Sequence, residues 1–120
     1  EVERVGMEVA MAHERREGRR VEDVSALNLG YDLRSEGAEG DVRYIEVKAR
    51  ARTGPIALTP NEWLMAHRLG NEYWLYIVEN AAQNPILYRI RDPAVRLQPE
   101  EVVEAVRYIV DVEQWRKVAS

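Results

Sequence analysis

The sequence predicts an α/β (mixed α+β) domain in which helices flank a mixed central sheet, with elements in the order αβββαβ. Three observations support this prediction. An amphipathic helical pattern opens the chain, strand-length apolar or alternating runs follow, and a second helix with a complete start signal separates the third strand from the fourth. With 120 residues, 46% of them hydrophobic, the chain can bury one core, so we expect a single domain over residues 1–120.

The first half of the chain predicts one helix and three strands. Residues 1–17 carry apolar side chains at helical spacing and are followed by Gly18, a typical helix end; these side chains are Val2, Val5, Met7, Val9, Met11 and Ala12. Residues 21–25 and 31–35 are of strand length. The glycine-rich segment 36–40 predicts a hairpin turn into a third strand, residues 41–51.

The second half begins with a clear helix start. Thr59 at the cap, Pro60 at the first helical position and Glu62 three residues after the cap form a capping box, and Gly70 is expected to end the helix. The nearly continuous apolar run 72–79 predicts an interior strand covered on both faces, and residues 86–91 predict its hairpin neighbour. A short helix starting at Pro99 and a last strand over 108–112 complete the prediction.

The third strand changes character along one of its faces. Because alternate side chains point to opposite faces, one face is mostly apolar and suits a core: Arg43, Ile45, Val47, Ala49 and Ala51. The other face begins apolar and becomes charged halfway along the strand: Val42, Tyr44, Glu46, Lys48 and Arg50. Glu46 and Lys48 share this face about 6.5–7 Å apart.

Asp32 on the preceding strand is expected to face the same side. The hairpin would then place its carboxylate beside Glu46 and Lys48. Two carboxylates are hard oxygen ligands for Mg²⁺ or Mn²⁺, and a neighbouring lysine can orient or deprotonate a water or stabilise a charged phosphate. We also expect Glu8 on the inner side of the first helix, as a third carboxylate. A cross-strand ion pair is the structural alternative, and it accounts for Asp32, Glu46 and Lys48 without any catalysis.

Composition restricts the chemistry and the location of the protein. No cysteine is present, which excludes disulfides, thiolate zinc sites and cysteine nucleophiles, and His13 and His67 are too few for a histidine-built metal site. No apolar run approaches the roughly 18 residues of a membrane span and no signal peptide opens the chain, so we expect a cytoplasmic (intracellular) protein without a membrane partner. The chain begins at Glu1 rather than Met, which suggests a fragment of a larger protein.

The charge balance excludes a uniformly basic surface but allows a local basic patch. The chain has 21 acidic and 17 basic residues, with a net charge of −4. Lysine occurs only at Lys48 and Lys117, so arginine supplies the other 15 basic residues. One of the two lysines, Lys48, is therefore the lysine of the candidate site on the third strand.

Four motifs in order carry a family resemblance: residues 30–32 (Gly-Tyr-Asp), 44–48 (Tyr-Ile-Glu-Val-Lys), 58–63 (Leu-Thr-Pro-Asn-Glu-Trp) and 73–78 (Tyr-Trp-Leu-Tyr-Ile-Val). Together they resemble the helicase-associated domain at the C-terminus of NO VEIN, a domain of unknown function, over about residues 1–92. That family resembles the PD-(D/E)XK superfamily of restriction-endonuclease-like nucleases. The signature would be Asp32 followed by Glu46-Val47-Lys48, with tyrosine instead of proline before the aspartate.

The resemblance implies a restriction-endonuclease-like αβββαβ core and Mg²⁺- or Mn²⁺-dependent hydrolysis of phosphodiester bonds. Asp32 and Glu46 would be metal ligands, Lys48 the catalytic lysine and Glu8 an additional ligand. The expected partners are DNA, with RNA as the alternative, and a helicase domain in the same or a partner chain of a defence or repair protein. A homodimer is expected if both DNA strands are cut.

Nucleic-acid contacts are expected from four side chains near the candidate site: Arg34, Arg50, Arg52 and Asn61. Helix capping already accounts for Glu62, and the aromatic residues Trp63, Tyr73, Trp74 and Tyr76 occupy core-like positions rather than a base-stacking platform. The alternative function is a catalytically silent nuclease-like module that binds nucleic acid or a partner protein.

Overall fold

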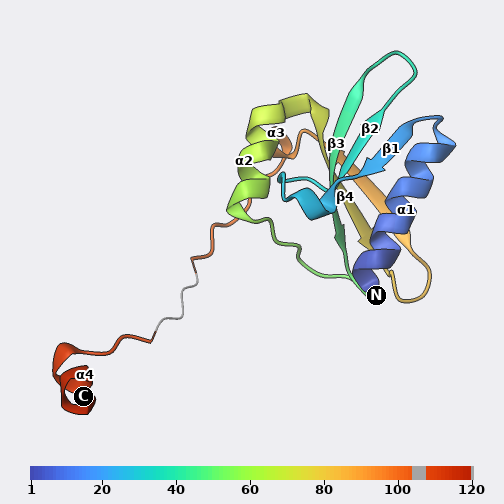
Figure 1. The fold of residues 1–120 in the computed structure, drawn as a ribbon. Coiled ribbons are helices and arrows are strands. Elements are labelled where there is room, and N and C mark those ends of the chain that lie inside the picture. The colour runs from blue at the N-terminus through green and yellow to red at the C-terminus, as the bar shows by residue number, and fades with distance from the viewer. Residues whose placement is uncertain (104–107, 120) are drawn as a thin grey trace.

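Five strands form one mixed sheet in the order β1-β2-β3-β4-β5, with helices on both faces (Figure 1). The structure is a computed structural model that describes residues 1–103 and 108–119. The elements are α1 (Val2–Arg16), β1 (Arg20–Asp23), β2 (Leu33–Glu36), β3 (Val42–Ala49), α2 (Pro60–Leu69), β4 (Tyr73–Glu79), β5 (Ile86–Arg91), α3 (Pro93–Arg96) and α4 (Val112–Val118), with single 3₁₀ turns at Ser25–Leu27 and Gly70–Glu72. The predicted mixed α+β architecture and the order of elements through β4 are confirmed.

Strand pairing follows from the connections. The tight turn after β2, closed by the Gly37 N–H bond to the Asp41 carbonyl (2.8 Å), makes β2 and β3 antiparallel, as predicted. The crossover through α2 brings β4 back parallel to β3, with Glu46 opposite Leu75. A second hairpin pairs β5 antiparallel with β4. The apolar strand β4 is therefore interior, as its sequence predicts.

The helix α1 covers one face of the sheet, and α2 covers the other (Figure 1). The core beneath α1 contains the fully buried Ala10, Leu33, Ile45 and Tyr76. The prediction of the buried face of α1 was partly wrong: its most buried row is Gly6, Ala10 and Glu14, whereas the valines of this helix are half-buried. The reason is close approach of the backbones, because a Cβ on Gly6 would lie 2.7 Å from the Ala49 Cβ.

The start of α2 matches its sequence signal. Glu62 N–H donates to the Thr59 hydroxyl (3.1 Å), and Thr59 N–H donates to the Glu62 carboxylate (2.9 Å), which completes the predicted capping box. The helix ends at Gly70, also as predicted. None of the helices within the described ranges is both long enough and apolar enough to cross a lipid bilayer.

The C-terminal region differs from its prediction. Residues 99–103 are not helical, and the rest of the helix predicted from Pro99 falls on residues 104–107, which lie outside the described residues. The strand predicted over 108–112 is wrong, because residues 108–111 have no strand partner and α4 begins at Val112. An isolated strand has nothing to satisfy its hydrogen bonds, and the apolar side chains of Tyr108 and Ile109 are exposed.

Candidate functional site

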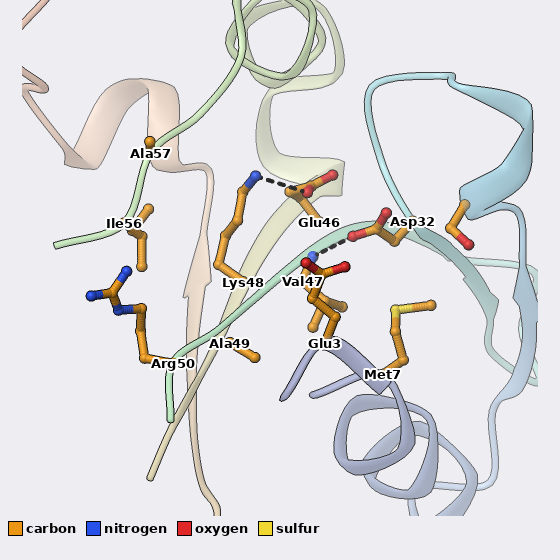
Figure 2. A pocket seen from close by; sticks show the side chains of 11 residues that line it. Glu3, Met7, Asp32, Glu46, Val47, Lys48, Ala49, Arg50, Ile56 and Ala57 are labelled. Carbon is orange, nitrogen blue, oxygen red and sulfur yellow. Dashed lines mark hydrogen bonds and ion pairs between the residues drawn. The ribbon is translucent and has the colours of Figure 1, made fainter. Parts of the chain in front are cut away.

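A pocket of about 390 Å³ lies just beyond the last residue pair of β2 and β3 (Figure 2). Its walls come from the start of α1, from Asp32 just before β2, from β3 and from the loop that follows β3. The lining residues include Glu3, Met7, Asp32, Glu46, Val47, Lys48, Ala49, Arg50, Ile56 and Ala57. A smaller pocket of about 160 Å³ shares Asp32 and Glu46 with it and continues to Tyr31, Asn61 and Glu62. The charged face predicted for the third strand therefore lines a pocket.

Asp32 is fixed by the backbone at the point where β2 begins. Its N–H donates to the Ile45 carbonyl (2.8 Å), and its carboxylate accepts the Val47 N–H (2.9 Å). β2 pairs with β3 only from Leu33 onward, so the carboxylate takes the place of a strand partner for the Val47 amide. Burial raises the pKa of Asp32 above its ordinary value, and the nearby Glu62 carboxylate adds to the rise, although the Val47 N–H opposes it.

Glu46 is the most perturbed acid of the site. Only 3% of the residue is exposed, and burial together with the neighbouring carboxylates of Asp32 and Glu62 raises its pKa to about 9. The Lys48 ammonium lies 3.4 Å from its Oε2 and opposes the rise, and Figure 2 shows the two side chains directed toward each other. A pocket residue with a pKa raised this far by burial and neighbouring charges is a candidate functional group.

Lys48 is held between two carboxylates. Its Nζ donates to Glu62 Oε1 at 2.9 Å, in addition to the longer contact with Glu46. Burial lowers the pKa of Lys48, but the hydrogen bond and the charges of these carboxylates outweigh it, so the pKa is raised overall. The lysine is therefore protonated at neutral pH.

Glu62 belongs to this site, which the sequence interpretation missed. Its Oε1 accepts both the Thr59 N–H of the capping box and the Lys48 ammonium, each at 2.9 Å. Burial raises the pKa of Glu62, but Lys48 and the Thr59 amide outweigh that effect and lower it overall. The motif at residues 58–63 contains Glu62, but in the sequence alone helix capping accounts for this residue.

Glu8 does not reach the pocket, so the expectation that it lies on the inner side of α1 is wrong. Its side chain is 62% exposed and forms an ion pair with Arg4, one helical turn away. Residue 8 is on the solvent side because the helix buries the row through Gly6 and Ala10. The carboxylate that α1 does bring to the pocket is Glu3.

The four residues predicted to contact nucleic acid are placed differently from one another. Arg50 lines the main pocket and Asn61 the smaller one. Arg34 lies on β2 directly opposite Tyr44, and its guanidinium is 3.6 Å from Glu36. Arg52 is exposed and lines neither pocket. The structure thus brings Asp32, Glu46, Lys48 and Arg50 together.

A second acidic cluster lies on the opposite face of the sheet. His13, Glu14 and Glu17 place one ligand atom each within 4.8 Å of one another, and no other trio of such residues in the described part of the chain is this tight. Arg43 donates to both carboxylates, at 3.1 Å and 2.8 Å, and Arg19 lies 3.5 Å from Glu14, so two guanidinium groups balance the two carboxylates. This cluster is a structural network, whereas the main pocket is lined by the carboxylates of Glu3, Asp32 and Glu46, and the smaller pocket adds Glu62.

Comparison with known proteins identifies relatives of this chain. The family model described as "Protein NO VEIN, C-terminal" matches residues 2–90. "Protein NO VEIN" of Arabidopsis thaliana is 37% identical over 75 residues, which cover 61% of this chain and 3% of that much longer protein. No solved structure matches.

Proposed function

The chain belongs to the NO VEIN C-terminal family, and from this membership and its pocket we propose that it is a metal-dependent nuclease domain of the PD-(D/E)XK type. The observation that carries the proposal is the convergence of Asp32, Glu46 and Lys48 on one pocket. The order α1-β1-β2-β3-α2-β4, with β3 and β4 parallel, supports a restriction-endonuclease-like core. The proposed reaction is hydrolysis of phosphodiester bonds in DNA.

The donor set of the pocket suits a hard divalent cation. Asp32 and Glu46 supply carboxylate oxygens. Burial together with neighbouring carboxylates raises both pKa values, because the ionised forms are poorly stabilised. A bound cation would stabilise the ionised forms. Mg²⁺ commonly binds through one or two carboxylates plus water and substrate phosphate, so two ligands are sufficient. When bound, Mg²⁺ or Mn²⁺ supplies the positive charge that acidifies a water and neutralises charge at the phosphate.

The structure suggests a specific role for Lys48. Because its pKa is raised, the ammonium is a poor general base but a good hydrogen-bond donor to a phosphate oxygen. Glu62 holds Nζ at 2.9 Å and so positions it beside Glu46. We therefore assign to Lys48 the stabilisation of negative charge on the reacting phosphate, and to Glu62 the orientation of Lys48.

A second positive charge on the pocket wall, Arg50, extends the proposal to substrate binding. Arg50 lines the pocket next to Lys48, and its guanidinium packs against Gly54 in the following loop. This position suits a contact with a phosphate next to the one that is cleaved. As in the family resemblance, a helicase in the same or a partner chain would deliver the DNA.

DNA cleavage with a matched lysine control tests the nuclease proposal. Supercoiled plasmid is incubated with the wild-type chain in Mg²⁺, Mn²⁺ or EDTA, and nicked and linear products are quantified. We expect metal-dependent cleavage that falls at least about 100-fold in Asp32→Asn and Lys48→Met. Lys117→Met, which removes the only other lysine at an exposed position of α4, should cleave like wild type. Equal cleavage by all four proteins would contradict the proposal.

A catalytically silent binding module is the second candidate, favoured by a Lys48 ammonium that is already paired with carboxylates. It predicts salt-dependent DNA binding that persists in EDTA, with no cleavage in either metal. The same plasmid assay, combined with a binding titration, therefore separates the two candidates.

A further inference from the structure

Two tyrosines lie beside the candidate site. Tyr31 immediately precedes Asp32, and Tyr44 lies two residues before Glu46 on the same face of β3. Their rings pack edge to face, with centroids 5.0 Å apart and an interplanar angle of 67°. Tyr31 also lines the smaller pocket together with Asp32 and Glu46. The aromatic pair is therefore continuous with the site.

Structural anchoring does not explain these two tyrosines. Tyr73 and Tyr76 are fully buried, and their hydroxyls donate to the Gly30 carbonyl (2.8 Å) and to Glu14 (2.6 Å). Tyr31 and Tyr44 are only half-buried, and among the described residues neither hydroxyl has a hydrogen-bond partner. An aromatic surface that is partly open to solvent and lacks a polar anchor is suited to contact a planar ligand.

An arginine completes this surface. Arg34 faces Tyr44 across the β2–β3 ladder, so both side chains lie on the same face of the sheet. The Arg34 side chain is 39% exposed, and its nearest carboxylate, Glu36 at 3.6 Å, is held more tightly by Arg20 at 2.5 Å. The Arg34 guanidinium thus keeps hydrogen-bonding capacity for an anion.

We propose that Tyr31, Tyr44 and Arg34 form a subsite for an unpaired nucleotide next to the phosphate in the pocket. A base stacks on the tyrosine pair, and Arg34 binds the adjoining phosphate. A base can stack on protein only when it is free of its own duplex neighbours, so the subsite selects single-stranded or frayed DNA over intact duplex. The proposal rests on the nuclease function for the identity of the ligand, but binding at the subsite requires no cleavage.

Fluorescence anisotropy in EDTA tests the subsite without catalysis. The probes are a fluorescein-labelled 12-mer of thymidylate, the same backbone with abasic units, and a 12-base-pair duplex, all at one salt concentration. We expect the thymidylate 12-mer to bind at least about tenfold more tightly than the abasic strand or the duplex. Equal affinity of the wild-type protein for the base-carrying and abasic strands, or no binding of either, would overturn the proposal.

Single substitutions distinguish the contribution of base stacking to affinity from that of charge, and both from a general effect on folding. Tyr44→Leu should weaken thymidylate binding about tenfold and leave abasic binding unchanged, whereas Tyr44→Phe should keep the wild-type affinity. Arg34→Gln should weaken both strands. Tyr88→Leu is the control, since Tyr88 is 48% exposed on β5 and bonds to Glu79. A loss in Tyr88→Leu equal to that in Tyr44→Leu would contradict the assignment.

The two proposals fail in different ways. Base-dependent binding without metal-dependent cleavage would remove the nuclease function and keep the subsite. Cleavage that depends on Asp32 and Lys48, combined with equal binding of abasic and thymidylate strands, would remove the subsite alone.

Discussion

Two glutamates are buried on opposite faces of the same sheet, and their surroundings are opposite in character. Glu14 on α1 is fully buried, and Glu46 on β3 is 3% exposed. The carboxylate of Glu14 accepts hydrogen bonds from Ser35, Arg43 and Tyr76, and Arg19 lies 3.5 Å away. In contrast, Glu46 has one cation, Lys48, and two carboxylate neighbours, Asp32 and Glu62.

The comparison shows that the balance of charges around a buried acid, rather than burial itself, marks a candidate functional site. The α1 face places two guanidinium groups and two hydroxyls around one carboxylate, which satisfies its lone pairs. The α2 face gathers three carboxylates around one ammonium. Burial and repulsion among them raise the pKa of Glu46 to about 9, so Glu46 keeps a proton at neutral pH, and a bound cation would displace that proton.

The largest change in stability should come from neutralising Glu14, the buried acid that is surrounded by hydrogen-bond donors and cations. Glu14→Gln leaves Arg43 and Arg19 without their buried partner, so we expect the free energy of unfolding to fall by about 3 kcal/mol. Urea unfolding at pH 7 measures this change.

The matched control for that variant is Glu17→Gln. Glu17 also bonds Arg43, but its side chain is 35% exposed, so the loss should stay below about 1 kcal/mol. If the two variants lose equal stability, the contrast between a structural and a functional acid is wrong on the α1 face.

Neutralising Glu46, in contrast, should raise the free energy of unfolding. Its pKa is about 9 in the folded chain against an ordinary value of 4.5, so between these values the folded state holds a proton that the unfolded state releases. Stability contributed by this group therefore falls as the pH rises through that window. Glutamine does not ionise, so Glu46→Gln should not lose stability as the pH rises. We expect this variant to be more stable than wild type by on the order of 2 kcal/mol at pH 8 and equally stable at pH 4.5.

Thermal and urea unfolding at both pH values check this sign. Glu39→Gln, at an exposed position in the β2–β3 turn, is the control and should show no such pH dependence. A Glu46→Gln variant that is less stable than wild type at pH 8 would mean that Glu46 is a structural acid like Glu14.

A divalent cation should stabilise the unbalanced face alone. At a Mn²⁺ concentration ten times its dissociation constant, ligand linkage adds about 1.4 kcal/mol to the stability of the wild-type chain. We expect this gain, measured as a rise in Tm, to disappear in Asp32→Asn and in Glu46→Gln. A gain that persists in both variants and disappears in Glu17→Gln would place the cation on the α1 face, at the cluster of His13, Glu14 and Glu17.

Local signals explain why much of the fold was predictable. The capping box at Thr59 and the apolar run of β4 each depend on residues close in sequence, and the structure confirms both. The alternation predicted along β3 is seen only in part, because Ile45 of the apolar face and Glu46 of the charged face are both buried. The placement of Asp32 beside the charged half of β3 followed from a single hairpin. These features required no knowledge of how helices pack on the sheet.

Helix packing accounts for what the sequence did not reveal. The rotation of α1 is set by the fit of Gly6 against Ala49, and that rotation exposes Glu8 and buries Glu14. Glu62 reaches Lys48 only because α2 packs against the sheet at β4, so its second role is a tertiary contact. The failed strand at 108–112 had suitable residues but no neighbouring strand with which to pair.

The smallest change in stability should come from Glu62, which links the cap of α2 to Lys48. Glu62 Oε1 serves the helix cap and Lys48 at once, and glutamine keeps an acceptor oxygen there while removing the charge. We therefore expect Glu62→Gln to lower the free energy of unfolding by only about 0.5 kcal/mol, less than the roughly 1 kcal/mol expected for Thr59→Ala, which deletes the cap acceptor. Urea unfolding of both variants at pH 7 measures the two changes.

A loss of stability in Glu62→Gln as large as that in Glu14→Gln would show that ion pairs hold the α2 face together. Asp32, Glu46 and Lys48 would then be structural residues as well.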